Sequence, residues 1–400
     1  MLRGGLWCLA LALLAPGANA QTFELSGHAE VETRIFPFSP AFPEQKRSTV
    51  SPSLALQPEF RIEWNDRQDR ITAIPFVRLD ADDDERTHGD VRALNWTHRA
   101  QNWDLVAGID RVFWGVAESR HLVDVINQAD LVENLDEEDR LGQPMVNFNY
   151  FTRFGAFGVF VLPGFRERTF PDREARLRGS SPILADDARY ESGAEQRHVD
   201  FAARWWHTVG GLDIALAHFH GTGREPRLVP EMRSGEDVFV PFYDQIDQSS
   251  ATALYAVGNW LLKFEGLTRS GQGDRFFATV AGFEYTIPGV FGRRPDLGLL
   301  AEYHYDGRDA AAPPTGFDRD VFVGARLTLN DPEGTELLAG AIIDQSDQAT
   351  TFTLEAERRL GDRWTIEMEA RLFVNVPPSD TLLYGIRRDD HLLLRLSRFF

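Results

Sequence analysis

The chain has almost no cysteine and almost no lysine. Its single cysteine, Cys8, lies close to the N-terminus, and Lys46 and Lys263 are the only lysines among 400 residues. From residue 21 onward the chain can therefore form no disulfide within itself, and it offers no thiol as a metal ligand or nucleophile. The formal net charge is −19. This acidic balance argues against nucleic-acid binding, which depends on neutralising phosphates.

The sequence also lacks the patterns that mark common enzyme sites. It contains no Gly-x-Ser-x-Gly nucleophile elbow, no His-Glu-x-x-His zinc motif and no Gly-x-x-x-x-Gly-Lys phosphate loop. Serine, histidine and aspartate are present, but no arrangement of them stands out. We therefore expect no catalytic residue, no metal site and no cofactor.

The first twenty residues have the three parts of a secretory signal. Arg3 supplies a basic start, residues 6–15 form an apolar core, and Ala18-Asn19-Ala20 is a small-residue cleavage site. The apolar core is too short to span the roughly 30 Å of a bilayer interior as a helix, and no later run is apolar enough to do so. We expect residues 1–20 to be removed and residues 21–400 to form a single mature domain.

Apolar and polar residues alternate strictly in segment after segment of this mature chain. In the first segment Phe23, Leu25 and Val31 fall on one face, whereas Glu24 and Glu30 fall on the other. A period of two indicates a β-strand, and the segment exceeds the roughly 9–11 residues that a transmembrane strand needs. A soluble sandwich would rarely place so many charges on one face of strands this long. The pattern predicts an all-β membrane protein, a closed antiparallel transmembrane β-barrel.

The connections between these segments alternate between short and long. The short ones lie near residues 65–70, 99–102, 153–155, 208–211, 258–259, 288–296, 330–335 and 361–362. The mostly longer ones lie near residues 37–49, 80–89, 114–144, 163–195, 221–247, 270–273, 307–316, 345–348 and 375–389. Outer-membrane barrels have short periplasmic turns and long external loops. We count about eighteen strands, with sixteen as the main alternative because segments 145–152 and 249–257 are weak.

Seven tryptophans lie beside the short connections: Trp64, Trp96, Trp103, Trp205, Trp206, Trp260 and Trp364. Aromatic rings collect at membrane interfaces, where the apolar ring can keep a polar edge wet. We interpret these residues as an aromatic girdle at the periplasmic interface.

The chain ends in the alternating segment 391–400, with Leu392, Leu394, Leu396 and Phe400 on one face. This end resembles the terminal signal strand of Gram-negative outer-membrane barrels, although Arg398 stands where an apolar residue is usual. The mature chain as a whole resembles porin-like outer-membrane proteins of proteobacteria, and segments 108–115 and 124–127 are similar to a strand and loop of poorly characterised families of that kind. The resemblance implies location in the outer membrane, contact with its lipid and lipopolysaccharide, and recognition of Phe400 by the barrel-assembly machinery.

The long connection at residues 115–143 combines an irregular apolar stripe with a high density of carboxylates. An apolar stripe needs a packing partner, and loops longer than about 15 residues are often functional. We therefore expect this loop to fold into the lumen and narrow it, the alternative being a solvated external loop. Its acidic residues are the candidate constriction: Asp124, Asp130, Glu133, Asp136, Glu137, Glu138 and Asp139.

Strand parity places charges of both signs on the lumen face. The basic ones are Arg34, Arg61, Arg78, Arg204, Arg326, Arg371 and Arg395, and the acidic ones are Glu63, Glu284, Glu302, Glu355, Glu367 and Glu369. Opposed acidic and basic walls can set ion selectivity. The alternative is that these charges pair across strands and stabilise the barrel.

A barrel near this size encloses an aqueous lumen unless a plug fills it. The sequence therefore predicts a porin-like channel for the passive diffusion of small hydrophilic solutes. An outer-membrane barrel enzyme of the lipase or protease kind and a structural or adhesive barrel are the alternatives. The pattern indicates neither the solute nor the oligomeric state.

Overall fold

The computed structural model describes residues 21–292 and 294–400. The expected signal, residues 1–20, lies outside the described residues. Eighteen antiparallel strands form one sheet, with these bounds: β1 (Thr22–Ile35), β2 (Val50–Trp64), β3 (Asp69–Asp80), β4 (Gly89–Arg99), β5 (Trp103–Asp110), β6 (Gln143–Thr152), β7 (Gly155–Pro163), β9 (Val199–Val209), β10 (Leu212–Thr222), β13 (Gln245–Val257), β14 (Trp260–Ser270), β15 (Phe276–Ile287), β16 (Asp296–Asp306), β17 (Asp320–Thr328), β18 (Glu336–Asp344), β19 (Thr350–Leu360), β20 (Trp364–Val374) and β21 (His391–Phe399).

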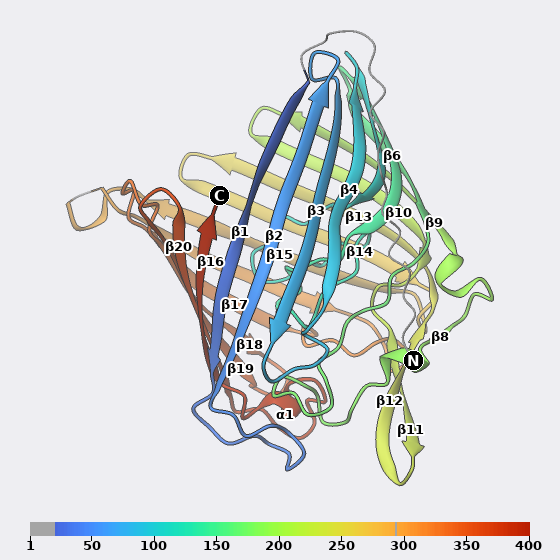
Figure 1. Cartoon of the computed structure of the whole chain (residues 1–400), viewed down its shortest axis with the longest axis vertical. Helices are drawn as coiled ribbons and strands as arrows, with labels where there is room; N and C mark the ends of the chain where they lie inside the picture. Colours follow the sequence, from blue (N-terminus) through green and yellow to red (C-terminus); the bar gives the residue numbers. More distant parts are fainter. Residues whose placement is uncertain (1–20, 293) are drawn as a thin grey trace.

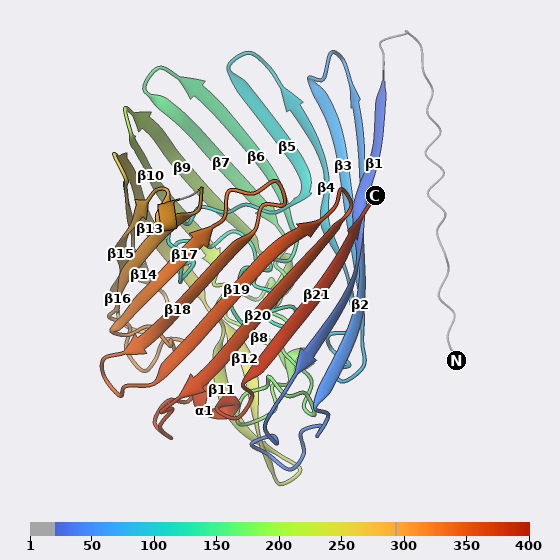
Figure 2. The ribbon, with the colours of Figure 1, turned by 90° about the vertical axis from the view of Figure 1, so that its left-hand side faces the viewer.

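The sheet closes on itself because its first and last strands pair. β1 is bonded to β2 on one side and to β21 on the other, in a register that places His28 opposite Phe399 and Ile35 opposite Leu392. Closure leaves no unpaired edge, which is what a strand-built membrane protein requires. The predicted closed antiparallel barrel is confirmed, with eighteen strands rather than sixteen, since both weak segments form strands, β6 and β13 (Figures 1 and 2).

Successive connections lie alternately at the two ends of the strands, and those at one end are mostly shorter, as the sequence predicted. The exceptions are connections 288–295 and 329–335, which are longer than connections 271–275 and 345–349 at the other end. The short turns gather at one rim and the longer connections at the other, as Figure 2 shows from the side. Left-handed backbone closes several of the short turns, for example at Asn65 and Asp66 between β2 and β3 and at Gly258 between β13 and β14. Asparagine, aspartate and glycine tolerate that conformation best.

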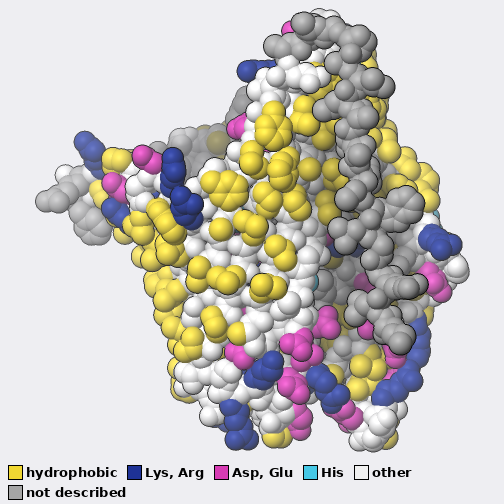
Figure 3. All heavy atoms as spheres, in the orientation of Figure 1, with side chains coloured by type: hydrophobic (Ala, Val, Ile, Leu, Met, Phe, Trp, Pro, Cys, Tyr) yellow, Lys and Arg dark blue, Asp and Glu magenta, His cyan; other side chains and the backbone are white. Residues whose placement is uncertain are grey.

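The outer face of the strands is apolar. Phe23, Leu54, Val77 and Leu372 are among the large hydrophobic side chains that remain exposed. Figure 3 shows such side chains spread over the wall, while charged side chains gather at both rims and are most numerous at the long-loop rim. A folded chain exposes this much contiguous apolar surface where it meets lipid or a partner. The closed barrel with an apolar exterior is the architecture of an outer-membrane protein.

All seven tryptophans of the predicted girdle lie toward the short-turn rim. Strand parity places six of them on the outer face. Trp206 is the exception, because it points into the lumen, where the Arg204 guanidinium lies 5.7 Å from its ring centre. The girdle interpretation is therefore wrong for Trp206.

A few small elements lie outside the barrel wall. β8 (Arg189–Tyr190), β11 (Arg227–Arg233) and β12 (Glu236–Tyr243) form a three-stranded sheet, whose hairpin projects beyond the long-loop rim in Figure 1. The other elements are short helices: η1 (Ala185–Asp187), η2 (Glu195–Arg197), η3 (Val290–Gly292) and α1 (Leu383–Ile386). No helix among the described residues is long and apolar enough to cross a membrane.

Candidate pore and the loop within it

The connection between β5 and β6, residues 111–142, contacts inward-pointing side chains on several sides of the barrel. Its first limb is held by Glu265 of β14, a fully buried carboxylate. Glu265 accepts hydrogen bonds from three backbone N–H groups of the loop, those of Val116, Ala117 (2.8 Å) and Val123 (3.2 Å). Bonds from backbone donors to a charged acceptor are among the stronger ones in proteins, so Glu265 fixes the path of this limb.

A second carboxylate, Glu302 of β16, holds the next two residues of the loop. It accepts bonds from the N–H groups of Glu118 (2.8 Å) and Ser119 (3.0 Å), and from the Ser119 hydroxyl. The Glu118 side chain in turn lies 3.0 Å from Lys263 of β14 and forms an ion pair with Arg326 of β17. Glu302 and Arg326, two predicted lumen residues, thus bind the loop rather than face open water.

An apolar cluster fills the space between the loop and one part of the wall. On the loop side it contains Trp114, Leu122, Val123, Val125 and Ile126. On the wall side it contains Phe160 and Leu162 of β7, Phe219 of β10, Leu267 of β14, and Phe276 and Val280 of β15. The apolar stripe recognised in the sequence therefore has its packing partner inside the barrel.

The second limb of the loop is held by arginines of β1 to β4. Arg92 donates to Asp130 (2.7 Å), and Arg78 donates to Glu133 (2.9 Å). Arg34 donates to the backbone carbonyl of Glu133. All five side chains are nearly inaccessible to solvent. Removing one partner of a buried pair costs far more than an exposed pair contributes, so these contacts specify where the limb lies.

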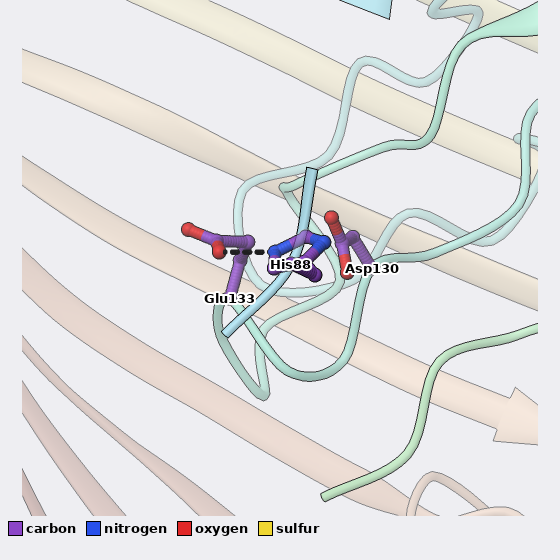
Figure 4. A group of neighbouring side chains, drawn as sticks. All are labelled: His88, Asp130 and Glu133. Atoms are coloured by element: carbon purple, nitrogen blue, oxygen red, sulfur yellow. Dashed lines mark hydrogen bonds and ion pairs between the residues drawn. The ribbon is translucent and has the colours of Figure 1, made fainter. Parts of the chain in front are cut away.

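His88, Asp130 and Glu133 lie close enough together to suggest a metal site. Their potential ligand atoms all fall within 4.8 Å of one another, and Figure 4 shows His88 lying between the two carboxylates and bonded to Glu133 (2.8 Å). Both carboxylates, however, already accept bonds from Arg92 and Arg78. A divalent cation placed here would meet two guanidinium charges at close range, so the donor set fits an ion-pair network better than a metal.

The remaining acidic residues of the loop have different surroundings. Asp124 accepts bonds from the Trp114 and Gly115 N–H groups and so stabilises the loop itself. Asp136 pairs with Arg371 of β20 (2.7 Å), and Glu137 pairs with Arg168 (3.0 Å).

Glu138 and Asp139 have no arginine or lysine partner within 4.0 Å among the described residues. The nearest basic group to Glu138 is His121, at 3.9 Å. The Glu138 side chain is 64% exposed to the lumen, but its enclosure within the barrel, with Asp136 and Glu355 nearby, raises its pKa to about 7. Burial, with Glu133 and Asp136 nearby, raises the pKa of Asp139 to about 6. By contrast, although burial opposes it, the arginines and His88 around Glu133 hold its pKa well below the usual range.

The other predicted lumen charges are mostly paired along the wall. Arg395 contacts Glu32 (3.0 Å) and Glu367 (2.8 Å), and Arg371 contacts Glu369. Nearer the short-turn rim, Arg61 contacts Glu59 (2.6 Å), Glu63 contacts Arg67 (3.6 Å), and Glu284 contacts Arg326 (3.8 Å). Arg204 instead lies over the ring of Trp114, 5.4 Å from its centre. Most of these charges are therefore paired, which favours the alternative that they stabilise the barrel over the alternative that they form opposed acidic and basic walls.

A cavity of about 450 Å³ lies between the loop and strands β17 to β20. The loop bonds to β17 through Glu118 and to β20 through Asp136. Among the described residues, no hydrogen bond or ion pair joins it to β18 or β19. The cavity runs from the long-loop ends of these strands, at Asp320 and Asp344, down to Leu338 and Glu355 near mid-strand.

Sequence reasoning missed the contribution of the other long connections to this cavity. Leu177 and Ile183 before β9, Phe317 before β17, and Leu382, Leu383 and Ile386 before β21 also line it. These apolar residues lie in otherwise polar connections, and this difference is the one feature of the sequence that could have indicated that they line a cavity.

Comparison with known proteins gives distant structural similarities only. No protein-family model matches the chain, and no curated protein matches it. Among solved structures, a triple mutant of the Rh. blastica porin is 9% identical, with 95% of this chain and 100% of that chain covered and a TM-score of 0.45. OmpT, an outer-membrane protein of Vibrio cholerae solved in a trimer form, is 11% identical, with 96% and 100% covered and a TM-score of 0.48. The function of this outer-membrane-type barrel is therefore inferred from its own geometry.

Proposed function

We propose that the protein is an outer-membrane channel through which small hydrophilic solutes diffuse passively. One observation carries the proposal: the loop is bonded to several sides of the wall, but its apolar side chains pack against β7 to β15 and a cavity of about 450 Å³ remains along β17 to β20. A plug would be expected to fill the whole cross-section, whereas a constriction loop leaves a path beside it. The long-loop rim would face outward and the short turns the periplasm, after export by the signal.

The constriction would lie where Glu118 meets Arg326 and Asp136 meets Arg371. Glu138 and Glu355 line the same cavity as Glu118, Asp136 and Arg371, and no arginine or lysine of the described chain lies within ion-pair distance of either. Charges in a confined channel act more strongly than in bulk water. We therefore expect a modest preference for cations, which salt would weaken. Most carboxylates of the acidic stretch cannot add to this cation preference, because Asp130, Glu133, Asp136 and Glu137 are each paired with an arginine.

Planar-bilayer recording tests the proposal directly. Purified, refolded protein should show discrete conductance steps and a reversal potential shifted modestly toward cation selectivity. Liposome swelling with a series of neutral solutes would then give the size limit. Protein that shows heat-modifiable migration on gels, and is therefore folded, but never conducts would contradict the channel. Hydrolysis of lipid or peptide by such a preparation would favour a barrel enzyme instead.

A further inference from the structure

The cavity beside β17 to β20 is less polar than a path for hydrophilic solutes alone requires. Inward-facing wall residues Phe322 and Phe373 meet Phe317, Leu122 and Leu383 from the connections around it. Small-molecule sites are typically apolar cavities of about 300–1,000 Å³ with a few placed polar groups. The size and lining of this cavity fit that description, and its polar groups decide which charge a ligand could carry.

The four arginines that line the cavity are each paired with a carboxylate. Arg120 pairs with Asp306 (2.7 Å), Arg168 with Glu137 (3.0 Å), Arg308 with Glu225 (2.8 Å), and Arg371 with Asp136 (2.7 Å). An anionic ligand would have to compete with these carboxylates for each guanidinium.

Several carboxylates that line the cavity have no such partner. Within the described part of the chain, no arginine or lysine lies within 4.0 Å of Glu138, Asp320, Asp344, Glu355 or Asp380. Asp344 and Asp380 accept backbone N–H groups of their own connections, whereas no hydrogen bond reaches the side chain of Glu355. The lining of the cavity therefore contains more carboxyl groups than arginines, and five of these carboxyl groups have no arginine or lysine partner within the described part of the chain.

Among these carboxylates, Asp320, the first residue of β17, gives the strongest evidence for a ligand. Its side chain lines the cavity but is only 1% exposed, and its Oδ2 atom has no hydrogen-bond partner. A buried carboxylate oxygen without a donor is costly. The basic group that most favours its charged form is Arg120, which stacks on Phe317 (4.9 Å) and is bound to Asp306. Asp344 lies opposite Asp320 in the pairing of β17 with β18, Asp318 lies two residues before it, and both disfavour its charged form. A ligand that donates hydrogen bonds and carries positive charge would satisfy this oxygen.

We propose that the cavity binds an organic cation with an apolar body, of the alkylamine or arylamine class, with its ammonium group at Asp320 and its apolar part against Phe322 and Phe373. The inference rests on the proposed channel in that the cavity would be a binding station on the solute path. It narrows the solute class from small hydrophilic molecules in general to amphipathic amines.

The test is calorimetric binding to the full-length protein refolded in detergent, a measurement that does not need conduction. The probes are phenethylammonium, the anion phenylpropionate, which has a similar body, and methylammonium, which lacks the apolar body. We expect phenethylammonium to bind and the other two to bind much more weakly. Asp320→Asn keeps the shape and removes the charge, and it should weaken binding by about tenfold or more. Glu63→Gln, near the short-turn rim, is the matched control and should change nothing.

The outcomes separate the two proposals. Equal binding of the ammonium and carboxylate probes, or unchanged affinity in Asp320→Asn, would overturn the inference, and preferred binding of phenylpropionate would point to Arg120 instead. If Asp320→Asn loses its heat-modifiable migration, Glu355→Gln and Phe322→Ala replace it, and undiminished affinity in both would be equally decisive against the site. Conductance without binding of the ammonium probe would support the channel and overturn the amine site. Binding without conductance would support the amine site and overturn the channel.

Discussion

Replacing Glu265 should release the first limb of the inward loop without unfolding the barrel. The carboxylate accepts three backbone N–H groups of the loop, two through Oε1 and one through Oε2. In Glu265→Ala all three bonds are lost. In Glu265→Gln the amide keeps one oxygen and replaces the other by a donor that cannot accept the Val123 N–H group. The barrel ladder is untouched by either change, because β14 keeps its backbone pairing with β13 and β15.

The size of the effect follows from the number of bonds. A hydrogen bond to a charged group contributes about 1.5–3 kcal/mol, and bonds that share one acceptor are not additive. We therefore expect Glu265→Ala to weaken attachment of the limb by about 3 kcal/mol, or roughly a hundredfold in the ratio of detached to attached states. Glu265→Gln should cost about half as much, since one acceptor oxygen survives. The apolar cluster around Trp114 and Val123 still holds the limb, so detachment should be transient.

Single-channel recording is the assay, with limited proteolysis as an independent readout. Glu265→Ala should show noisier current with brief excursions to higher conductance and faster cleavage within residues 114–124. Glu265→Gln should be intermediate, and Glu63→Ala, which removes an inward carboxylate that does not touch the loop, should match the unaltered protein. If Glu265→Ala is as quiet and as resistant to protease as the control, Glu265 does not hold the loop and the reasoning fails.

Three further predictions concern charge, the constriction and assembly. Because the pKa of Glu138 is raised from 4.5 to about 7, cation preference should rise as the pH rises from about 6 to 8, and Glu138→Gln should flatten that profile in reversal-potential measurements. The folded state holds the Glu138 proton more tightly than the unfolded chain does, so the stability that Glu138 contributes declines as the pH rises from 4.5 through about 7. A series of thermal-melting measurements over that pH range should show this decline, and the decline should be smaller in Glu138→Gln. Deleting residues 133–139 removes the anchor at Arg78 together with Glu138, and should raise conductance and lower cation preference; unchanged values of both would place the loop outside the conducting path. Removing Phe400 should reduce the amount of heat-modifiable barrel recovered from the outer membrane, and full recovery would contradict its role as an assembly signal.

Sequence reasoning predicted the barrel because alternation is a local property. Inward and outward residues are fixed by parity along each strand, and the turns at Asn65 and Gly258 are marked by residues that tolerate left-handed backbone. Parity says which way Arg78 points but not what it meets. Its partner Glu133 lies 55 residues away in a connection without periodicity, so the pairing could not be read from the chain.

The same limit explains why the acidic loop was interpreted too simply. A run of carboxylates from Glu133 to Asp139 predicts a negative constriction only if those groups stay free. Pairing through Arg78, Arg168 and Arg371 neutralises three of them, and each of these arginines comes from a different part of the chain. The apolar cavity was missed for a related reason, since its lining is assembled from single residues of many connections.

Because of the apolar cluster beneath the loop, part of the barrel wall is apolar on its inner face as well as on its outer face. β7 shows the effect within one strand: Val159 and Val161 are exposed on the outside, while Phe160 and Leu162 are buried against the loop. A barrel stripped of all of residues 111–142 would therefore not be a wide tube with a polar lining. The wall from β7 to β15 would instead expose an apolar stripe to the water in the bore. In this molecule the loop that occupies the bore also covers the apolar part of the wall.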